Sequence, residues 1–331
     1  MIFSASRTKA FLAAAMALSL TGAVNAAAPA APADWSRAHD HIQAAERLAG
    51  REWTPTVSYL CIPGGAPNLL ADPAVEPMRL FDNVYAIGDR GTLAFAIDTP
   101  DGIILIDALY PEKQDSVLLP GLKALGLDPA RVKYVLITHG HSDHFGGAAY
   151  FQATYGARVG VSARDWAGME AQPRQMGRLK RDLVLEDGKP VTLGDVAVTP
   201  IDTPGHTPGS MGFIFPVRDH GTVRMAAVYG SSLLRLQRAS VEDLQQFVGS
   251  VGRFAAATRR AGVEVELQNH PLFDGLFDKA ARLKTNGPDA PNPFVVGKAA
   301  YQRFLGVMTE CAGAALARRG AAAPPPLARR N

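Results

Sequence analysis

Residues 138–147 carry the segment THGHSDHFGG, directly after VKYVLI at 132–137, which is apolar except for Lys133. An apolar run of this length is typical of a strand buried on both faces, and layered α/β folds place their chemistry in the loops that follow such strands. Gly140 and Ser142 are small enough to let the chain turn tightly around an ion. Four potential metal ligands fall within six residues here: His139, His141, Asp143 and His144. The segment therefore predicts a metal site at a strand end.

Two further histidines lie in comparable surroundings. His206 lies in TPGHTPGS at 203–210, whose prolines and glycines favour a tight turn, and His270 lies in QNHP at 268–271, after an apolar run. A lone loop histidine is usually an ordinary surface residue, so no role is assigned to three others: His39, His41 and His220. Beside the 139–144 cluster, however, His206 and His270 complete two sets of three ligands. Imidazole and carboxylate ligands suit zinc, and three protein ligands with an open position are typical of a catalytic site.

Strand patterns and helix patterns alternate along the chain. Strands are predicted at 84–87, 93–97, 102–109, 132–138, 158–161 and 263–268, with a β-rich stretch at 182–229. Helices are predicted at 116–125, 147–155, 241–260, 273–283 and 295–318. Two successive sets of strands followed by helices favour two sheets packed face to face with helices outside. The predicted fold class is therefore a layered α/β sandwich.

The histidine segments resemble those of the metallo-β-lactamase superfamily. Besides THGHSDHFGG and TPGHTPGS, the likeness includes NHP at 269–271 and the strand GIILIDAL at 102–109, and it covers roughly residues 76–285. The resemblance implies a four-layer αβ/βα sandwich. It also implies two zinc ions per chain, one bound by His139, His141 and His206 and the other by Asp143, His144 and His270. Asp107 would then orient a ligand histidine, or else cap a loop at the strand end.

The residues that follow the second histidine segment indicate which branch of the superfamily the sequence resembles. Most of its hydrolases, including type II glyoxalases and many lactonases, have an aspartate there that bridges the two zinc ions. Residues 225–233, MAAVYGSSL, contain neither Asp nor Cys. The third subclass of β-lactamases has a serine instead, which Ser232 matches, although Ser231 and Ser232 can also be plain loop residues. Leu234 replaces a further substrate-binding serine of that subclass, and Arg235 is the candidate to bind a substrate carboxylate in its place.

The expected activity is zinc-dependent opening of the amide ring of β-lactams. A hydroxide shared by two zinc ions would attack the carbonyl carbon, because zinc lowers the pKa of bound water to about 7, and Asp143 would orient this hydroxide as a catalytic residue. One alternative is a lactonase or another ester or amide hydrolase of the same fold. Another alternative is a zinc-binding protein without catalytic activity. The expected partner is a small molecule, either a β-lactam or a lactone.

The N-terminal residues have the pattern of a secretory signal. Two basic residues precede an apolar run at 10–20, which is short for an uncleaved membrane anchor, and a small-residue cleavage site precedes Ala27. We therefore expect a signal peptide at 1–26, a single hydrolase domain at 27–319 and a disordered tail at 320–331. The expected location of the mature chain is the periplasm or the medium.

Charge and cysteine content limit the possible partners and bonds. The formal net charge of +3 is too small to favour nucleic acid or an anionic membrane as a partner. Cys61 and Cys311 are the two cysteines; in an oxidising compartment they can form a disulfide, and otherwise they are buried thiols. Residues 51–70, which include Cys61, are expected to form a loop, either over the pocket or elsewhere on the surface.

Overall fold

The computed structural model describes Met1, Ser232, Leu236 and residues 32–62, 73–230, 239–287 and 290–322. The described residues from 32 to 322 belong to one compact unit. The predicted signal peptide, apart from Met1, and the tail beyond residue 322 lie outside the described residues. Within the described ranges, no helix has both the length and the apolar character needed to cross a membrane.

Seven strands form the first sheet, in the order β1-β2-β3-β4-β5-β6-β7. Their bounds are Met78–Arg79, Val84–Gly88, Leu93–Thr99, Gly102–Ile106, Val132–Leu136, Arg158–Ser162 and Leu183–Leu185. Strands β1 to β4 pair antiparallel, and β4 to β7 pair parallel. The carboxyl ends of β4 and β5 therefore lie at the same edge of the sheet, which brings Asp107 close to the loop that begins at Thr138.

Five strands form the second sheet, in the order β12-β11-β10-β9-β8. In chain order from β8 to β12, their bounds are Val191–Leu193, Val196–Asp202, Met211–Asp219, Thr222–Val228 and Val265–Leu267. Asp202 pairs with Met211 across the antiparallel strands β9 and β10, and Val228 pairs with Leu267 across the parallel strands β11 and β12. This register places the ends of β9, β11 and β12 at one edge, so the loops that carry His206 and His270 start from the same edge of the sheet.

Apolar side chains of the two sheets face one another and form a shared core, in which Phe95 and Leu136 of the first sheet cluster with Phe213 of the second. The outer face of the first sheet is covered by helices and turns with the bounds Gln114–Leu118 (η2), Leu119–Ala124 (α3), Pro129–Arg131 (η3), Ser142–Phe145 (α4), Ala148–Tyr155 (α5), Ala163–Glu170 (α6) and Pro173–Met176 (α7). The outer face of the second sheet is covered by Trp35–Ala49 (α1), Thr54–Leu60 (α2), Val241–Ala261 (α8) and Lys298–Ala317 (α10). Helix α9, Leu276–Thr285, contributes Leu276 and Ala280 to the shared core. The two sheets with helices on both outer faces confirm the predicted sandwich.

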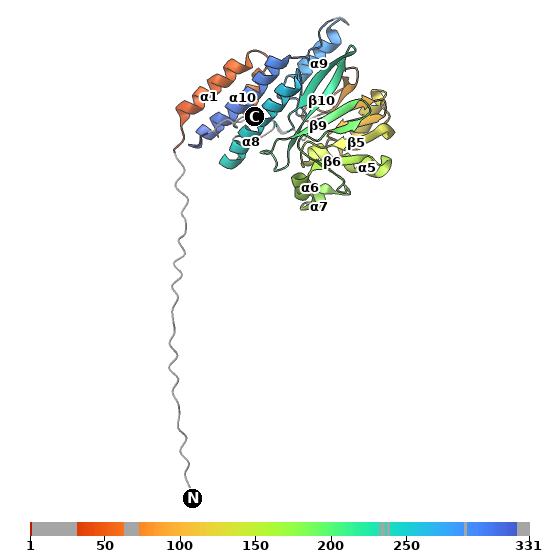
Figure 1. The fold of residues 1–331 in the computed structure, drawn as a ribbon, viewed down its shortest axis with the longest axis horizontal. Helices are drawn as coiled ribbons and strands as arrows, with labels where there is room; N and C mark the ends of the chain where they lie inside the picture. Colours follow the sequence, from red (N-terminus) through yellow and green to blue (C-terminus); the bar gives the residue numbers. More distant parts are fainter. Residues whose placement is uncertain are drawn as a thin grey trace. The chain divides into compact units, whose positions relative to one another are not determined.

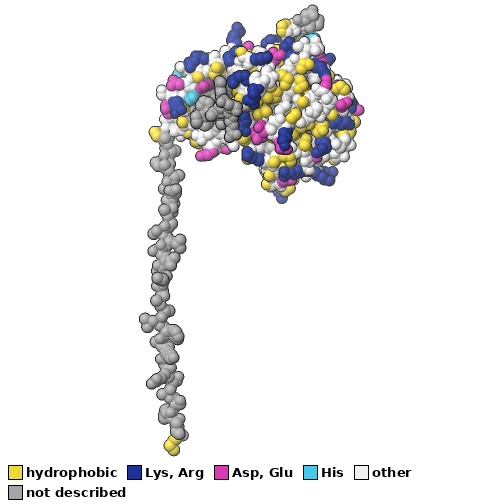
Figure 2. Space-filling model, in the orientation of Figure 1, with side chains coloured by type: hydrophobic (Ala, Val, Ile, Leu, Met, Phe, Trp, Pro, Cys, Tyr) yellow, Lys and Arg dark blue, Asp and Glu magenta, His cyan; other side chains and the backbone are white. Residues whose placement is uncertain are grey.

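Helices α1, α10 and α8 lie side by side on the outside of the second sheet (Figure 1). Helix α8 forms as its sequence predicts, because a capping box joins Ser240 and Asp243 at its start and the left-handed residue Gly262 ends it. On the face shown in Figure 2, basic and acidic side chains are interspersed over the body of the molecule.

Several predicted elements are corrected by the structure. The strand predicted at 102–109 ends at Ile106, because Asp107 and Leu109 adopt left-handed backbone conformations with φ of 62° and 57°. The predicted loop at 51–70 contains helix α2 instead, and its part beyond residue 62 lies outside the described residues. The sequence TPTVSYL of α2 is rich in β-branched residues, which lower helix propensity, so tertiary packing decides its structure.

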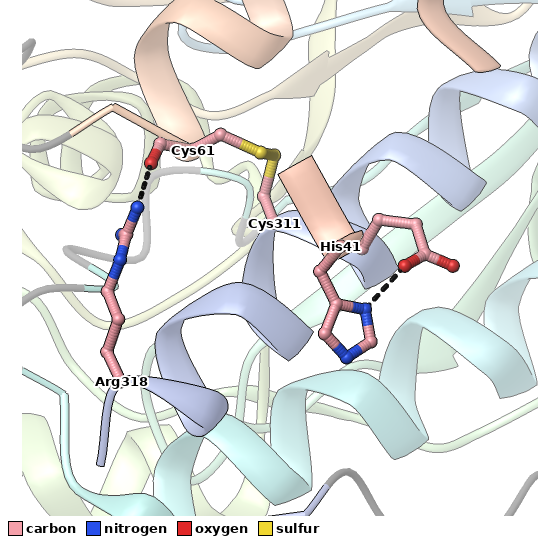
Figure 3. Close-up of a disulfide and its surroundings, with 5 residues drawn as sticks. His41, Cys61, Cys311 and Arg318 are labelled. Atoms are coloured by element: carbon pink, nitrogen blue, oxygen red, sulfur yellow. Dashed lines mark hydrogen bonds and ion pairs between the residues drawn. A yellow bond between two sulfur atoms is a disulfide. The ribbon is translucent and has the colours of Figure 1, made fainter. Parts of the chain in front are cut away.

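The two cysteines form a disulfide, which confirms that prediction (Figure 3). Cys61 ends helix α2, and Cys311 lies within helix α10. A guanidinium nitrogen of Arg318 donates to the carbonyl oxygen of Cys61 at 3.2 Å, and the Nδ1 of His41 on α1 lies 2.6 Å from a carboxylate oxygen of Glu310 on α10. The disulfide and these polar contacts thus connect helices α1 and α2 to the C-terminal helix α10.

Candidate metal centre

His139, His141 and His206 converge at the edge where the ends of β5 and β9 meet. The Nε2 of His206 lies 3.1 Å from the Nε2 of His139 and 3.1 Å from the Nδ1 of His141. Ligands about 2.0–2.1 Å from one tetrahedral zinc ion are separated by roughly 3.3 Å, so these spacings fit a single ion. The three side chains form one possible metal group.

In this first group His139 is buried, His206 is half-buried and His141 is exposed. Burial and the neighbouring histidines hold the pKa of His139 and of His206 well below the usual range, and they also lower the pKa of His141. The three rings are therefore neutral at pH 7, with nitrogen lone pairs directed at a common point. Such lone pairs repel one another unless a cation lies between them, so the arrangement favours metal binding.

Asp143, His144 and His270 form a second possible metal group beside the first. The Nε2 of His144 lies 3.2 Å from the Nε2 of His270 and 3.2 Å from Oδ2 of Asp143. The Nε2 of His270 lies 3.9 Å from the same Oδ2. The rings of His139 and His144 have centroids only 3.9 Å apart, so the two groups are adjacent. The six predicted ligands thus come together in the structure as two neighbouring sets of three.

The second group carries more charge than the first. Burial opposes protonation of His144, but Asp143 and Asp107 outweigh it and raise the pKa of His144 to about 10. Burial likewise opposes ionisation of Asp143, but His144 and His270 hold its pKa below the usual range. Burial, together with the charge on His144, lowers the pKa of His270 to about 4. Without metal, the group therefore contains an ion pair and one neutral imidazole.

Asp107 bonds directly to a ligand of the second group and contacts the first group through Thr138. Its Oδ2 accepts a hydrogen bond from the Nδ1 of His144 at 2.7 Å, and its Oδ1 accepts from the backbone nitrogen of Thr138 at 2.8 Å. The hydroxyl of Thr138 lies 2.9 Å from Oδ2 of Asp107 and 3.2 Å from the Nδ1 of His139. The geometry supports both roles expected for Asp107, because it orients the ligand His144 and also accepts from the backbone where the loop at Thr138 begins.

Two further supports are not visible as sequence patterns. The side-chain amide of Asn269 donates to Oδ2 of Asp107 at 2.9 Å, next to the ligand His270 in the chain. The Nδ1 of His270 donates to the carbonyl oxygen of Gly91 at 2.7 Å, in the turn between β2 and β3. A backbone carbonyl carries no residue signal, whereas Asn269 could have been suspected from its position beside His270.

Of the three predicted substrate-binding residues, Ser232 alone is among those that the structure describes. The side chain of Ser232 is fully buried, and its Oγ has no hydrogen-bond partner among the described residues. Ser231 and Arg235 lie outside the described residues. Their roles stay predictions.

The comparisons with known proteins agree with this geometry. Residues 87–220 match the family model of the metallo-beta-lactamase superfamily. The hydroxyacylglutathione hydrolase of Acidiphilium cryptum is 32% identical over 139 residues, which cover 42% of this chain and 46% of that protein. The hydroxyacylglutathione hydrolase of Cereibacter sphaeroides (strain ATCC 17029) is 29% identical over 216 residues, 57% of this chain and 79% of that protein. The chain thus spans about half the length of the first of these relatives.

The match to solved structures covers more of this chain than the match to these two relatives. The crystal structure of BJP-1, a subclass B3 metallo-beta-lactamase of Bradyrhizobium japonicum, has a TM-score of 0.56 and 28% identity, and it covers 69% of this chain and 89% of that one. The chain therefore contains a metallo-beta-lactamase superfamily domain, a domain of a hydrolase superfamily, and two groups of residues that could each hold a metal ion. Its neighbours in structure are subclass B3 metallo-beta-lactamases.

Proposed function

We propose that this protein is a hydrolase that uses two zinc ions to open the amide ring of β-lactams. The supporting observation is the composition of the two metal groups, which share no member and together contain a single carboxylate, that of Asp143. The aspartate expected to bridge the ions in type II glyoxalases and many lactonases has no counterpart at 225–233. An Asp-His-His second group without a bridging aspartate is the set expected for the third subclass of β-lactamases.

The donor set supports zinc as the metal. Five imidazoles and one carboxylate suit zinc, whereas centres that activate oxygen at iron commonly include more carboxylate. Zinc, when bound, would supply an activated water and a Lewis acid that polarises the substrate carbonyl.

The chain's own groups would prepare the centre for that chemistry. The neutral rings of the first group offer lone pairs without first losing a proton. Asp143 is 15% exposed, the most accessible member of the second group, so its carboxylate can also accept a hydrogen bond from a reacting water. Asp107 and Gly91 fix the rings of His144 and His270 through their Nδ1 atoms, which leaves each Nε2 directed at the centre.

Thioester hydrolysis is a second candidate function, favoured by the similarity to two proteins named hydroxyacylglutathione hydrolase. The absence of a bridging aspartate at 225–233 argues against it. Both reactions need a metal-activated water and a polarised carbonyl, so the substrate has to be distinguished by assay.

The test is a kinetic panel on purified protein whose zinc content has been measured. Nitrocefin, a carbapenem, a hydroxyacylglutathione thioester and a lactone are each assayed before and after treatment with EDTA. We expect β-lactam turnover that EDTA abolishes and added zinc restores. Turnover of the thioester or the lactone alone would overturn the β-lactam proposal, and β-lactam turnover that survives complete metal removal would overturn the metal mechanism.

Two variants make the panel specific to the site. His206→Ala removes a ligand of the first group, and we expect it to lose both activity and one zinc ion per chain. His39→Ala is the matched control, because His39 is an exposed histidine of α1 that bonds only with Gln43 among the described residues. The control should keep the activity and zinc content of the parent.

We also propose that the protein acts outside the cytoplasm, in the periplasm or the medium. The disulfide between Cys61 and Cys311 supports this location, because disulfides persist in oxidising compartments. N-terminal sequencing of protein recovered from a periplasmic fraction should give a chain that starts at Ala27. Full-length chain found only in the cytoplasm would refute the proposal.

A further inference from the structure

One buried carboxylate outside the two metal groups connects the loops of the first group. Asp165 lies in the first turn of α6 and is only 3% exposed. Its Oδ2 accepts hydrogen bonds from the backbone nitrogen of Gly140 and from the hydroxyl of Thr207, both at 2.7 Å. Its Oδ1 accepts from the backbone nitrogen of Gly209 at 2.8 Å.

The donors to Asp165 come from two loops that are distant in sequence. Gly140 lies between the ligands His139 and His141, whereas Thr207 follows the ligand His206 directly. A single side chain therefore joins the segments that supply all three members of the first group. The second group is supported elsewhere, by Asp107 and Gly91.

The loop that contains Thr207 and Gly209 packs directly against α6, with no free space between them. A β-carbon at Gly209 would lie 2.1 Å from the Oγ of Ser162 and 2.6 Å from the backbone nitrogen of Asp165. The Oγ of Ser162 in turn accepts a hydrogen bond from that nitrogen at 3.2 Å, which fixes the first turn of the helix. Because the carboxylate is buried, water cannot readily replace it as the acceptor for these donors.

We propose that Asp165 is the positioning residue of the first metal site. It holds the loop of His141 and the loop of His206 at the separation that one ion requires, seen in the 3.1 Å between their ligand nitrogens. Site geometry is maintained by such supporting hydrogen bonds, and a shift of about 0.5 Å is enough to impair a metal site. The inference rests on the metal-binding part of the proposed function and is independent of the substrate.

The test measures zinc affinity at each site separately, by competition with a coloured chelator. His270→Ala protein reports on the first site, and His206→Ala protein reports on the second. Asp165→Asn, which keeps the shape but replaces one acceptor oxygen by a donor, is introduced into each background. Circular dichroism of the metal-free proteins checks the fold, and Asp219→Asn is the control, because Asp219 is also buried but pairs with Arg224 far along β10.

We expect Asp165→Asn to weaken zinc binding about 10- to 100-fold at the first site and to leave the second site unchanged. The control variant should change neither affinity. No loss at the first site, or an equal loss at both sites, would overturn the proposal. If Asp165→Asn does not fold, Thr207→Val removes one donor to the same carboxylate and must give a loss confined to the first site.

The result also separates this inference from the proposed function. A His270→Ala parent that takes up no zinc would refute the metal centre itself. A parent that binds zinc equally well with and without Asp165 would refute only the positioning role.

Discussion

The Nδ1 of His144 lies 2.7 Å from Oδ2 of Asp107, and both side chains are fully buried. This contact fixes the ring so that its Nε2 points to the Nε2 of His270, 3.2 Å away. Asp107 adopts a left-handed backbone conformation with φ of 62°, which is unusual for a residue other than glycine. Backbone strain of this kind persists where surrounding contacts require it, and here the contacts are those of the metal centre.

Replacing Asp107 should therefore act on the second site. We expect Asp107→Asn to weaken zinc binding there by about 10- to 100-fold, since the amide offers one acceptor oxygen in place of two. The measurement is chelator competition in the His206→Ala background. Asp98→Asn is the control, because Asp98 pairs with Arg131 on the half-exposed end of β3. A loss confined to the first site would contradict this role for Asp107.

Loss of a ligand from the second group should be more severe. We expect His270→Ala to reduce bound zinc from two ions to one and to lower hydrolytic activity at least about 100-fold, more than the loss expected for a residue that only supports a ligand. Elemental analysis and the nitrocefin assay check the two expectations together. Two zinc ions per chain in the variant would show that His270 is not a ligand.

The sequence alone predicts the core of the candidate site because four of the six side chains lie within six residues after a buried strand. His206 and His270 could be added because each follows a strand and lies in a turn-rich segment. The buried strand β4 was also predictable, since it is a continuous apolar run, whereas the mainly apolar β5 contains the exposed Lys133.

The supporting residues could not be predicted in the same way. Asp165 meets Gly140 and Thr207 only after the chain has folded, and no local pattern marks a carboxylate that accepts from backbone nitrogens of two distant loops. Helix α2 was missed for a related reason, because a seven-residue helix has little stability of its own. Its structure depends on contacts such as the hydrogen bond from the hydroxyl of Thr56 to the carbonyl oxygen of Phe273, at 2.6 Å.

The disulfide should stabilise the whole fold. Cys61 and Cys311 are 250 residues apart in sequence, so the cross-link removes a large part of the freedom of the unfolded chain. We expect the double variant Cys61→Ser, Cys311→Ser to lose about 2–5 kcal/mol of unfolding free energy, measured by urea denaturation. Equal stability of the variant and the parent under oxidising conditions would contradict this expectation.

A buried cluster of Lys279, Glu266 and Asp274 should make the free energy of unfolding depend on pH. The Nζ of Lys279 lies 2.9 Å from Oε2 of Glu266 and 3.3 Å from Oδ2 of Asp274. The same Nζ lies over the Trp53 ring, 5.1 Å from the ring centre. Burial raises the pKa of Asp274 well above its usual value, with Lys279 opposing the shift and Glu266 adding to it. The Asp274 carboxyl group therefore retains a proton that it would lose in water.

The sign of the pH effect follows from that retained proton. A carboxyl group with a raised pKa binds its proton more tightly in the folded chain than in the unfolded chain, so its contribution to stability is lost as pH rises from about 4 through the folded pKa. Asp274→Asn removes this titration. We expect the unfolding free energy of the parent, relative to the variant, to fall with rising pH by up to about 1.4 kcal/mol per unit. Urea denaturation of metal-free protein at several pH values gives the difference, and a difference that is constant or rises with pH would mean that the cluster holds no extra proton.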